Sequence, residues 1–417
     1  MKIFKGNFVF SKSKDELVEF SNGYLLVDDE GIIVDLYKEI PTEYKALEAV
    51  DLKGDVVIPS FSDLHVHAPQ YPNRGIAMDK LLADWLNDYT FPLESKYKDP
   101  EFAKAVYSKF VDNMIKQGTM HAVVFGTIHN EATNILAQEF EKRGIMARIG
   151  KVNMDKDSQD YLIETTDEAV KNAEKFILEN KDNKYAKPII TPRFAPTCTF
   201  ELNRRLGDLS NKYKIGVQTH IVESLWEAEE CKKNYKGCKC DMEIYDKANL
   251  INQAPFVAAH YVFPSQEDID LMLKCGGYAV TCPDATTNVI AGIMRTGYLL
   301  DLGMNLGIGS DISAGSYLGI YTQVASVVRY SKYKYFYEPK GNREVLFKEA
   351  FYMGTKSGGS LFGKVGSFEK GYYFDALVLG DLQDSFREIS LAELVERFCY
   401  SGDVTNIKRR ILRGKDI

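Results

Sequence analysis

The sequence predicts an α/β protein, a (β/α)8 TIM barrel joined to a small composite β-sandwich domain built from both chain ends. Two observations favour this fold. Short apolar runs alternate eight times with longer, mostly amphipathic segments through the middle of the chain, and β-rich segments stand at its two ends. Strand–helix units repeated over roughly 300 residues are what such a barrel requires.

The eight apolar runs are the expected barrel strands. In chain order they read IPSFSDLHVH, MHAVVFGT, MARIGKVNM, PIITPRFA, IGVQTH, PFVAAH, GGYAVTC and NLGIGSD. Before the second run, apolar residues recur at four-residue spacing, which is typical of one face of a helix; they are Phe102, Val106, Phe110 and Met114. NEATNILAQEFEKRG and TTDEAVKNAEKFILEN fill the next two gaps as helices. We assign residues 59–365 to the barrel.

The two chain ends share a sequence pattern that differs from that of the middle of the chain. Near the N-terminus, GIIVDLY and GDVVIPSF are dense in β-branched residues and are punctuated by Gly or Asp, as strands are. The same pattern recurs in GSFEKGYYFDALVLGD near the other end. We therefore expect residues 1–58 plus 366–417 to form one small β-sandwich domain that brings the termini together.

Composition and charge exclude several classes of protein. The chain has 417 residues, a net charge of -7 and a pI near 5.6, which disfavours nucleic acid as the main partner. No stretch approaches the roughly 18 uncharged apolar residues of a membrane-spanning helix, and the N-terminus is interrupted by charge too early for a signal peptide. We expect a cytoplasmic enzyme without a membrane partner.

Seven cysteines lack the spacing of a disulfide framework. Three of them, Cys231, Cys238 and Cys240, cluster in CKKNYKGCKC. The favoured interpretation is an exposed lysine-rich loop in a reducing compartment. A metal site or a redox switch is the alternative, although structural zinc usually wants four ligands.

Metal-binding side chains stand at the ends of four predicted strands. His65 and His67 end the first, His220 the fifth, His260 the sixth and Asp311 the eighth. Side chains two apart on a strand share a face, and the C-terminal ends of barrel strands converge on one mouth. Four of the chain's six histidines occupy these positions. Imidazoles and a carboxylate that converge in this way form a zinc-type ligand set, which iron also accepts.

Glu223 follows His220 by three residues in HIVES. A carboxylate that is not a ligand but stands beside a metal-activated water is the natural group to move protons between water and substrate. We therefore take Glu223 as the candidate proton shuttle, with an exposed loop glutamate as the alternative.

These motifs resemble the amidohydrolase superfamily. DLHVHAPQY, HIVES, AAHYV and GIGSD carry the resemblance in the barrel, and GSFEKGYYFDALVLGD resembles the family's C-terminal signature. Within the superfamily, HAPQY, DWLNDYTFPLE, GKVNMD and TPRFAP closely resemble guanine deaminases. The resemblance implies hydrolytic deamination of guanine to xanthine and ammonia by a zinc-activated water, and a homodimer.

The resemblance also assigns residues. It implies one Zn²⁺ per subunit, held by His65, His67, His220 and Asp311. It implies catalytic roles for Glu223 as the shuttle, for His260 as the histidine that hydrogen-bonds the attacking hydroxide or the substrate, and for Asp311. The implied substrate-binding set is His67, Gln70, Trp85, Arg193, Phe194, His220, Glu223 and Asp311.

The chemistry of guanine agrees with this assignment. Its O6 and N7 are adjacent acceptors, which suit an arginine such as Arg193, and Gln70 offers both a donor and an acceptor to the other edges. Adenine would present its C6 amine to the arginine, donor against donor.

Three other interpretations stay open. The nearest is a one-metal deaminase of the same superfamily that acts on another aminated heterocycle. A two-metal cyclic-amide hydrolase of this superfamily would carry a lysine at the end of the fourth strand to bridge its ions. It is disfavoured because the fourth strand, PIITPRFA, has no lysine in its body and Lys187 lies only at its start. The third, of a different class, is a non-catalytic scaffold on this fold.

One segment departs from the guanine deaminase pattern. After the seventh strand the chain reads CPDATTNVIAGIMRTGY, and Asn288 is the candidate to fill the usual asparagine's role from a shifted register. The departure concerns the shape of the pocket and leaves the metal chemistry unchanged.

Overall fold

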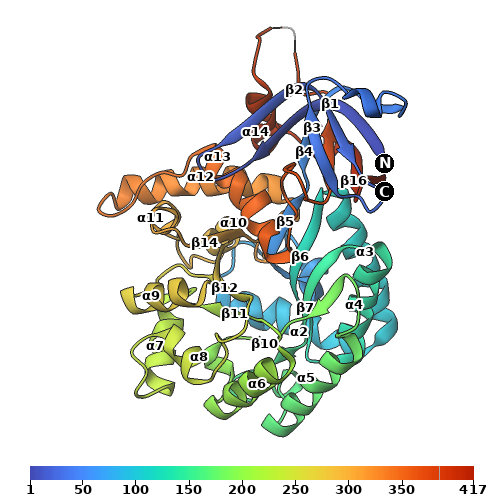
Figure 1. The fold of residues 1–417 in the computed structure, drawn as a ribbon. Helices are drawn as coiled ribbons and strands as arrows, with labels where there is room; N and C mark the ends of the chain where they lie inside the picture. Colours follow the sequence, from blue (N-terminus) through green and yellow to red (C-terminus); the bar gives the residue numbers. More distant parts are fainter. Residues whose placement is uncertain (385) are drawn as a thin grey trace.

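A computed structural model describes residues 1–384 and 386–417, and it confirms the barrel (Figure 1). Two four-stranded parallel sheets, ordered β5-β6-β7-β9 and β11-β12-β13-β14, supply the eight barrel strands within the described residues. Their bounds are β5 Phe61–His67, β6 Thr119–Phe125, β7 Met146–Gly150, β9 Ala186–Pro188, β11 Val217–Ile221, β12 Phe256–His260, β13 Tyr278–Thr281 and β14 Asn305–Ile308. Five of these strands lie within their predicted runs, β6 and β11 extend one residue beyond theirs, and β9 overlaps the fourth run, PIITPRFA, only at Pro188.

Helices surround these strands as the periodicity predicts. The barrel helices are α3 Pro100–Lys116, α4 Asn130–Arg143, α5 Thr166–Asn180, α6 Phe200–Tyr213, α7 Leu225–Asn234, α8 Asp241–Lys247, α9 Gln266–Cys275, α10 Pro283–Asn288, α11 Thr296–Asp301, α12 Ile320–Tyr337 and α13 Phe347–Tyr352. Phe110 and Met114 of the predicted stripe are fully buried, whereas Phe102 and Val106 pack half-buried against the core. Two short helices, α1 Leu82–Trp85 and α2 Phe91–Ser95, follow β5.

The barrel closes through backbone hydrogen bonds on both sides of the two sheets. Beside β5, the Asp311 N–H donates to the His65 carbonyl at 2.9 Å. On the opposite side, the Gln218 N–H of β11 donates to the Ile190 carbonyl at 2.9 Å. Gly309 permits the first contact, because a Cβ there would stand 2.7 Å from the Cβ of His65. Closure therefore brings the ends of the first and last strands together.

Both chain ends build one further sheet. Its order is β17-β16-β15-β4-β1-β2-β3; the N-terminus begins the inner strand β1, the C-terminus follows the edge strand β17, and the two ends are close together in Figure 1. Its strands are β1 Lys2–Ser11, β2 Leu17–Val27, β3 Ile33–Tyr37, β4 Ala49–Pro59, β15 Ala376–Leu379, β16 Ile407–Leu412 and β17 Lys415–Asp416. α14, Leu391–Ser401, packs against this sheet and against α12.

A buried histidine joins this sheet to the barrel. His121, on β6, contacts Asp375 through Nε2 at 3.0 Å, and its Nδ1 lies 3.2 Å from the Ser62 hydroxyl. His121 and Asp375 are both fully or almost fully buried. β4 ends at Pro59 and β5 begins at Phe61, so the chain passes directly from the terminal sheet into the barrel.

The lysine-rich cysteine segment differs from the favoured expectation of an exposed loop. Cys231 lies on α7 and is buried, because the helix continues to Asn234 and turns this side chain into the core. Cys238 and Cys240 are half-buried, and each of the three thiols is free. No candidate metal cluster within the described residues includes them. Within the same residues, no helix combines the length and the apolar character needed to cross a membrane.

Candidate active site

The strand ends bring five predicted side chains together. His65 and His67 stand on β5, His220 on β11 and His260 at the end of β12, and Asp311 follows β14. All five are buried, with between 1% and 8% of their surface exposed. Parallel strands of a barrel deliver their C-terminal ends to one mouth, which explains why residues nearly 250 positions apart meet here.

The ligand-type atoms of this cluster lie close to one another. The His67 Nε2 is 3.1 Å from the His220 Nε2 and 3.5 Å from the Asp311 Oδ1. That same carboxylate oxygen lies 3.3 Å from the His65 Nε2. On the other side, the Asp311 Oδ2 lies 3.8 Å from the His260 Nε2. Two sets of three, His65–His220–His260 and His65–His67–Asp311, have all their donor atoms within 4.8 Å.

The chemistry of these donors fits a metal cation. The Nδ1–H of His220 donates to the Arg193 carbonyl at 2.6 Å, which leaves the Nε2 lone pair of His220 facing the His67 Nε2. Two imidazole nitrogens at this distance need a shared proton or a cation between them. Among the residues that the structure describes, the buried His65 Nε2 has no hydrogen-bond partner, although the Asp311 Oδ1 lies 3.3 Å away. Such an orphaned nitrogen is costly unless a ligand satisfies it.

Burial governs the protonation of the cluster. It lowers the pKa of His65 to about 3 and that of His260 to about 4, while Asp311 partly opposes the second shift. Burial, with neighbouring imidazoles, also lowers the pKa of His67 and His220 well below the usual value. The histidines are therefore neutral at pH 7, which is the form that binds metals. Burial raises the pKa of Asp311 to about 6.

Glu223 lies in the loop between β11 and α7, beside the cluster. Its Oε1 is 3.6 Å from the His260 Nε2. Its own backbone N–H donates to the Glu227 carboxylate at 2.7 Å, which fixes the loop. Burial, together with the negative charges of Asp311 and Glu227, raises the pKa of Glu223 well above its ordinary value. A carboxyl group in this position is able to accept a proton and to return it.

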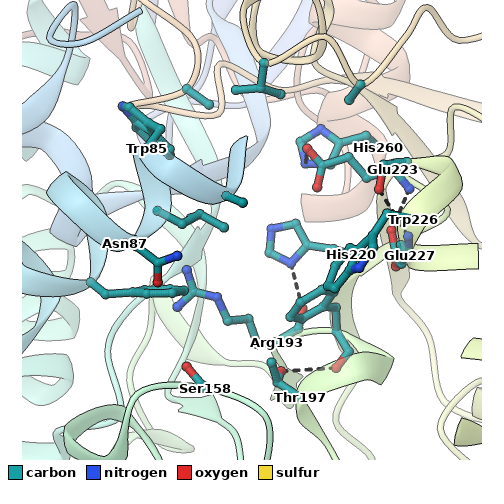
Figure 2. A pocket seen from close by; sticks show the side chains of 18 of the residues that line it. Trp85, Asn87, Ser158, Arg193, Thr197, His220, Glu223, Trp226, Glu227 and His260 are labelled. Carbon is teal, nitrogen blue, oxygen red and sulfur yellow. Dashed lines mark hydrogen bonds and ion pairs between the residues drawn. The ribbon is translucent and has the colours of Figure 1, made fainter. Parts of the chain in front are cut away.

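The cluster opens into a cavity of about 770 Å³. Ligand sites commonly measure about 300–1,000 Å³. Every predicted site residue except His65 lines the cavity, namely His67, Gln70, Trp85, Arg193, Phe194, His220, Glu223, His260 and Asp311. In Figure 2, His220 and Arg193 extend into the space between Trp85 on one side and Glu223 and Trp226 on the other. His65 is buried against Asp311, behind the lining.

Gln70 and Arg193 meet at a carboxylate that was not predicted from the sequence. Glu94, on α2, accepts from the Arg193 Nη1 at 2.7 Å and from its Nη2 at 3.2 Å. The Gln70 Nε2 donates to the same carboxylate at 3.0 Å. The Gln70 Oε1 in turn accepts from the Ser313 N–H at 3.2 Å. Glu94 therefore accepts one hydrogen bond from each terminal nitrogen of the Arg193 guanidinium. The remaining N–H groups of Arg193 are free to donate to a molecule in the cavity.

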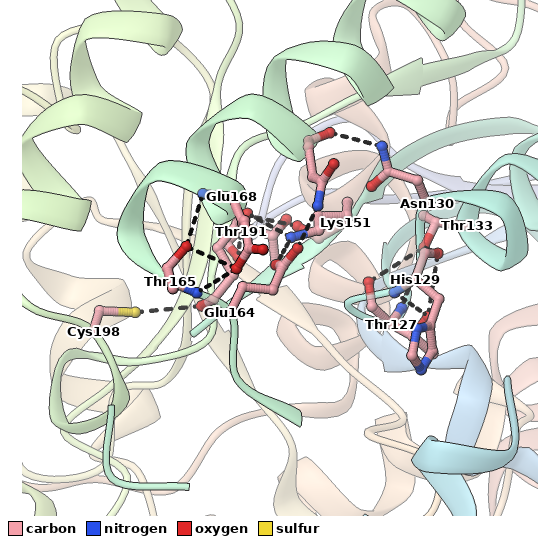
Figure 3. Close-up of polar contacts among 12 residues, drawn as sticks. Thr127, His129, Asn130, Thr133, Lys151, Glu164, Thr165, Glu168, Thr191 and Cys198 are labelled. Carbon is pink, nitrogen blue, oxygen red and sulfur yellow. Dashed lines mark hydrogen bonds and ion pairs between the residues drawn. The ribbon is translucent and has the colours of Figure 1, made fainter. Parts of the chain in front are cut away.

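A buried polar network supports the backbone that carries Arg193. The Arg193 N–H donates to the Asn153 carbonyl at 3.2 Å, where β8 (Val152–Asn153) pairs with β10 (Thr191–Pro192). The Asn153 side chain donates to the Thr191 carbonyl and accepts from the Lys151 ammonium at 3.2 Å. Lys151 is 1% exposed and pairs with Glu164 (Figure 3). The lysine is thus held by this ion pair, while Lys187 donates to the Lys181 carbonyl at the surface.

Aromatic residues form the walls of the cavity. Trp85 is 2% exposed and donates its indole N–H to the Ile76 carbonyl at 3.3 Å. Phe194 pairs through its backbone with His220, and its ring centre lies 6.3 Å from that of Trp226. Trp226 is 54% exposed although it lines the cavity. Sequence reasoning missed Trp226, whose position three residues after Glu223 was the available signal.

The unusual segment after β13 contributes to the same cavity. It forms α10, and the next residues, Val289, Ile290 and Ala291, are cavity-lining. Asn288 donates to the Ala314 carbonyl at 2.8 Å and to the Ser316 hydroxyl at 3.3 Å. This asparagine therefore ties the segment to the loop after β14.

The fold and the site agree with the outcome of sequence comparison. The chain belongs to the amidohydrolase family, whose model matches residues 56–415. Within that family it is similar over its whole length to guanine deaminases. The guanine deaminase of Dictyostelium discoideum is 33% identical, with 100% of this chain and 98% of the relative covered. The guanine deaminase of Homo sapiens is 31% identical, with 100% of this chain and 96% of the relative covered.

A solved structure extends this likeness to the fold. The guanine deaminase from C. acetobutylicum, with guanine bound in its active site, superposes with a TM-score of 0.96. Its sequence is 41% identical, and the alignment covers 100% of this chain and 99% of that one. The resemblance that the substrate-side motifs predicted is confirmed at the level of the family and of these relatives.

Proposed function

We propose that this protein is a guanine deaminase, which hydrolyses guanine to xanthine and ammonia. The observation that carries the proposal is a single cavity in which a histidine–carboxylate cluster and a buried arginine face one another. The first is the chemistry of a hydrolase, and the second is a recognition group for an oxo-purine. The full-length likeness to guanine deaminases supports the same substrate.

The proposed cofactor is one zinc ion per subunit, held by His65, His67, His220 and Asp311. Support comes from the neutral imidazoles, the orphaned Nε2 of His65 and the carboxylate oxygen shared between two histidines. When bound, such an ion makes water a stronger nucleophile and acid at neutral pH. The side chain of Lys187 lies at the surface, which favours one ion over a lysine-bridged pair.

The substrate is proposed to lie with its oxo edge toward Arg193. O6 and N7 of guanine both accept hydrogen bonds, and the guanidinium has N–H groups beyond those that Glu94 takes. Phe194 and Trp85 would enclose the flat faces and edge of the ring. Adenine would place a second donor against the buried arginine, and an unpaired buried donor is costly.

Three side chains are proposed to manage protons. Glu223 accepts a proton from the attacking water and delivers it to N3 while the C2–O bond forms. Asp311 and His260 hold the attacking oxygen through hydrogen bonds, as their 3.8 Å separation allows. Asp311 then helps to transfer the second water proton to the amine. The C2–N bond breaks, ammonia leaves, and C2 becomes the new carbonyl of xanthine.

The proposal includes a homodimer. Its candidate interface is the aromatic C-terminal end of α12, where Phe336 is 76% and Tyr337 74% exposed. Large exposed aromatic patches usually mark contact surfaces. Light scattering coupled to size exclusion is expected to give twice the 47.2 kDa chain mass. A monomeric mass at micromolar concentration contradicts this part of the proposal and leaves the activity unaffected.

The function is tested by measuring ammonia release from purified, zinc-loaded protein. Guanine, adenine, cytosine and an aminated triazine are offered in parallel, and purine absorbance follows the product. We expect release from guanine alone. Release from another base would retain the hydrolytic site and refute the assignment of substrate. Protein that binds zinc and releases ammonia from none of them would favour a cyclic-amide hydrolase or a scaffold.

A further inference from the structure

Glu94 is a buried carboxylate that touches both proposed recognition side chains without lining the cavity. We propose that Glu94 is a positioning residue that fixes the donor groups of Gln70 and Arg193, and thereby sets the selectivity for oxo-purines over amino-purines. This inference rests on the proposed function and deepens it. Glu94 is 4% exposed, and its two oxygens accept three hydrogen bonds from these partners.

The Gln70 amide has one orientation that satisfies both of its neighbours. A carboxylate only accepts hydrogen bonds, and a backbone N–H only donates. The amide nitrogen must therefore face Glu94 and the amide oxygen must face Ser313, as observed at 3.0 and 3.2 Å. The flipped amide would set acceptor against acceptor on one side and donor against donor on the other. Glu94 thus determines which end of Gln70 stands at each position.

Arg193 carries a buried positive charge. Its side chain is 8% exposed, so the guanidinium requires a counter-charge inside the protein. Asp311 and Glu223 line the same cavity and carry the opposite charge when they are ionised. The paired contacts with Glu94, at 2.7 and 3.2 Å, hold the guanidinium on its own wall. Without them, the arginine is free to turn toward the carboxylates of the reacting centre.

Together these contacts specify the substrate's chemistry. A guanidinium held in one place presents N–H donors to the ring edge, which a carbonyl accepts and an amine does not. The site is therefore matched to 2-amino-6-oxo-purines. It rejects 2,6-diaminopurine, which has the same 2-amino leaving group and differs at C6. Selectivity between these two substrates reports on the position of Arg193.

The test compares Glu94→Gln with a matched control, Glu349→Gln. Glu349 is 3% exposed and forms a similar paired contact with Arg343, at 2.9 and 2.8 Å, away from the cavity. We expect Glu94→Gln to lower kcat/KM for guanine about 100-fold, mainly through KM, or about 2.7 kcal/mol at 1.36 kcal/mol per tenfold. The preference for guanine over 2,6-diaminopurine should fall at least tenfold. Glu349→Gln should lower only the melting temperature.

Two further measurements separate positioning from general destabilisation. Glu94→Asp keeps the charge and should recover most of the selectivity. Crystal structures of the wild-type and Glu94→Gln proteins should show Arg193 and Gln70 displaced in the variant. The proposal would be overturned if Arg193 and Gln70 kept their wild-type positions in Glu94→Gln. It would also be overturned if the wild type were active on guanine and Glu94→Gln kept the same preference for guanine over 2,6-diaminopurine. Wild-type protein inactive on guanine would refute the function instead, and the crystallographic comparison would still decide the role of Glu94.

Discussion

Replacing Glu223 by glutamine is the most informative single change at the reacting centre. Glutamine keeps the size of the side chain and can still form hydrogen bonds, but it cannot take a proton from water. The Glu223 Oε1 lies 3.6 Å from the His260 Nε2, and this carboxylate is absent from both candidate ligand sets. The change should therefore remove proton transfer while zinc remains bound.

The expected magnitude follows from the acids that remain in the cavity. Three other carboxylates line it, and two are poor substitutes. Glu227 is 2% exposed and already accepts the backbone N–H of residue 223, while Asp157 is exposed to solvent. Only Asp311 stands at the cluster. General acid–base catalysis contributes about 10²–10⁴-fold, so kcat should fall by about 10³-fold, near the middle of that range.

The assay is steady-state conversion of guanine, with zinc content measured on the same sample. Wild-type zinc stoichiometry and a kcat lowered about 10³-fold are expected. A variant that retains a kcat within threefold of wild type would refute the shuttle role. Loss of zinc from Glu223→Gln would contradict the assignment of Glu223 as a residue that does not hold the metal.

Three other substitutions test the zinc site, the cavity wall and a buried carboxyl group. His220→Ala removes a proposed zinc ligand and should weaken zinc binding at least about 100-fold in chelator competition. Trp226→Ala removes an exposed cavity wall, so KM for guanine should rise about twofold to tenfold in steady-state assays with kcat nearly unchanged. Burial raises the pKa of Asp241 from 3.8 to about 7. Between these two pH values the carboxyl group keeps its proton in the folded state but has lost it in the unfolded state. The free energy of unfolding therefore falls as the pH rises from about 4 to about 7. Asp241→Asn should therefore unfold like wild type near pH 4 but be more stable at pH 8, by up to about 4 kcal/mol in denaturant titrations.

The barrel and its cluster were predictable because both depend on local pattern and on the direction of strands. His65, His67, His220, His260 and Asp311 each stand at or just after the end of an apolar run, and parallel strands bring such ends together. The predicted strands and the first three predicted helices are confirmed for the same reason. Whether these residues play their assigned roles stays a prediction until the variants are measured.

Glu94 could not be predicted by that route. It lies on a short helix rather than at a strand end, and its partner Arg193 is 99 residues away. Two signals were available: Glu94 ends the motif DWLNDYTFPLE, and a buried arginine needs a buried counter-charge, although the sequence does not reveal which carboxylate supplies it. Cys231 was misplaced for a related reason. Its neighbours are lysines typical of a surface, and only the packing of α7 shows that this one face is buried.

In the proposed reaction, water replaces the 2-amino group of guanine in this cavity. This replacement is tested most directly by letting zinc-loaded protein act on guanine in ¹⁸O-labelled water and examining the purine product by mass spectrometry. We expect xanthine that carries one ¹⁸O atom at C2, with ammonia released in equal amount. Unlabelled guanine recovered without ammonia, from protein with its zinc bound, would contradict it.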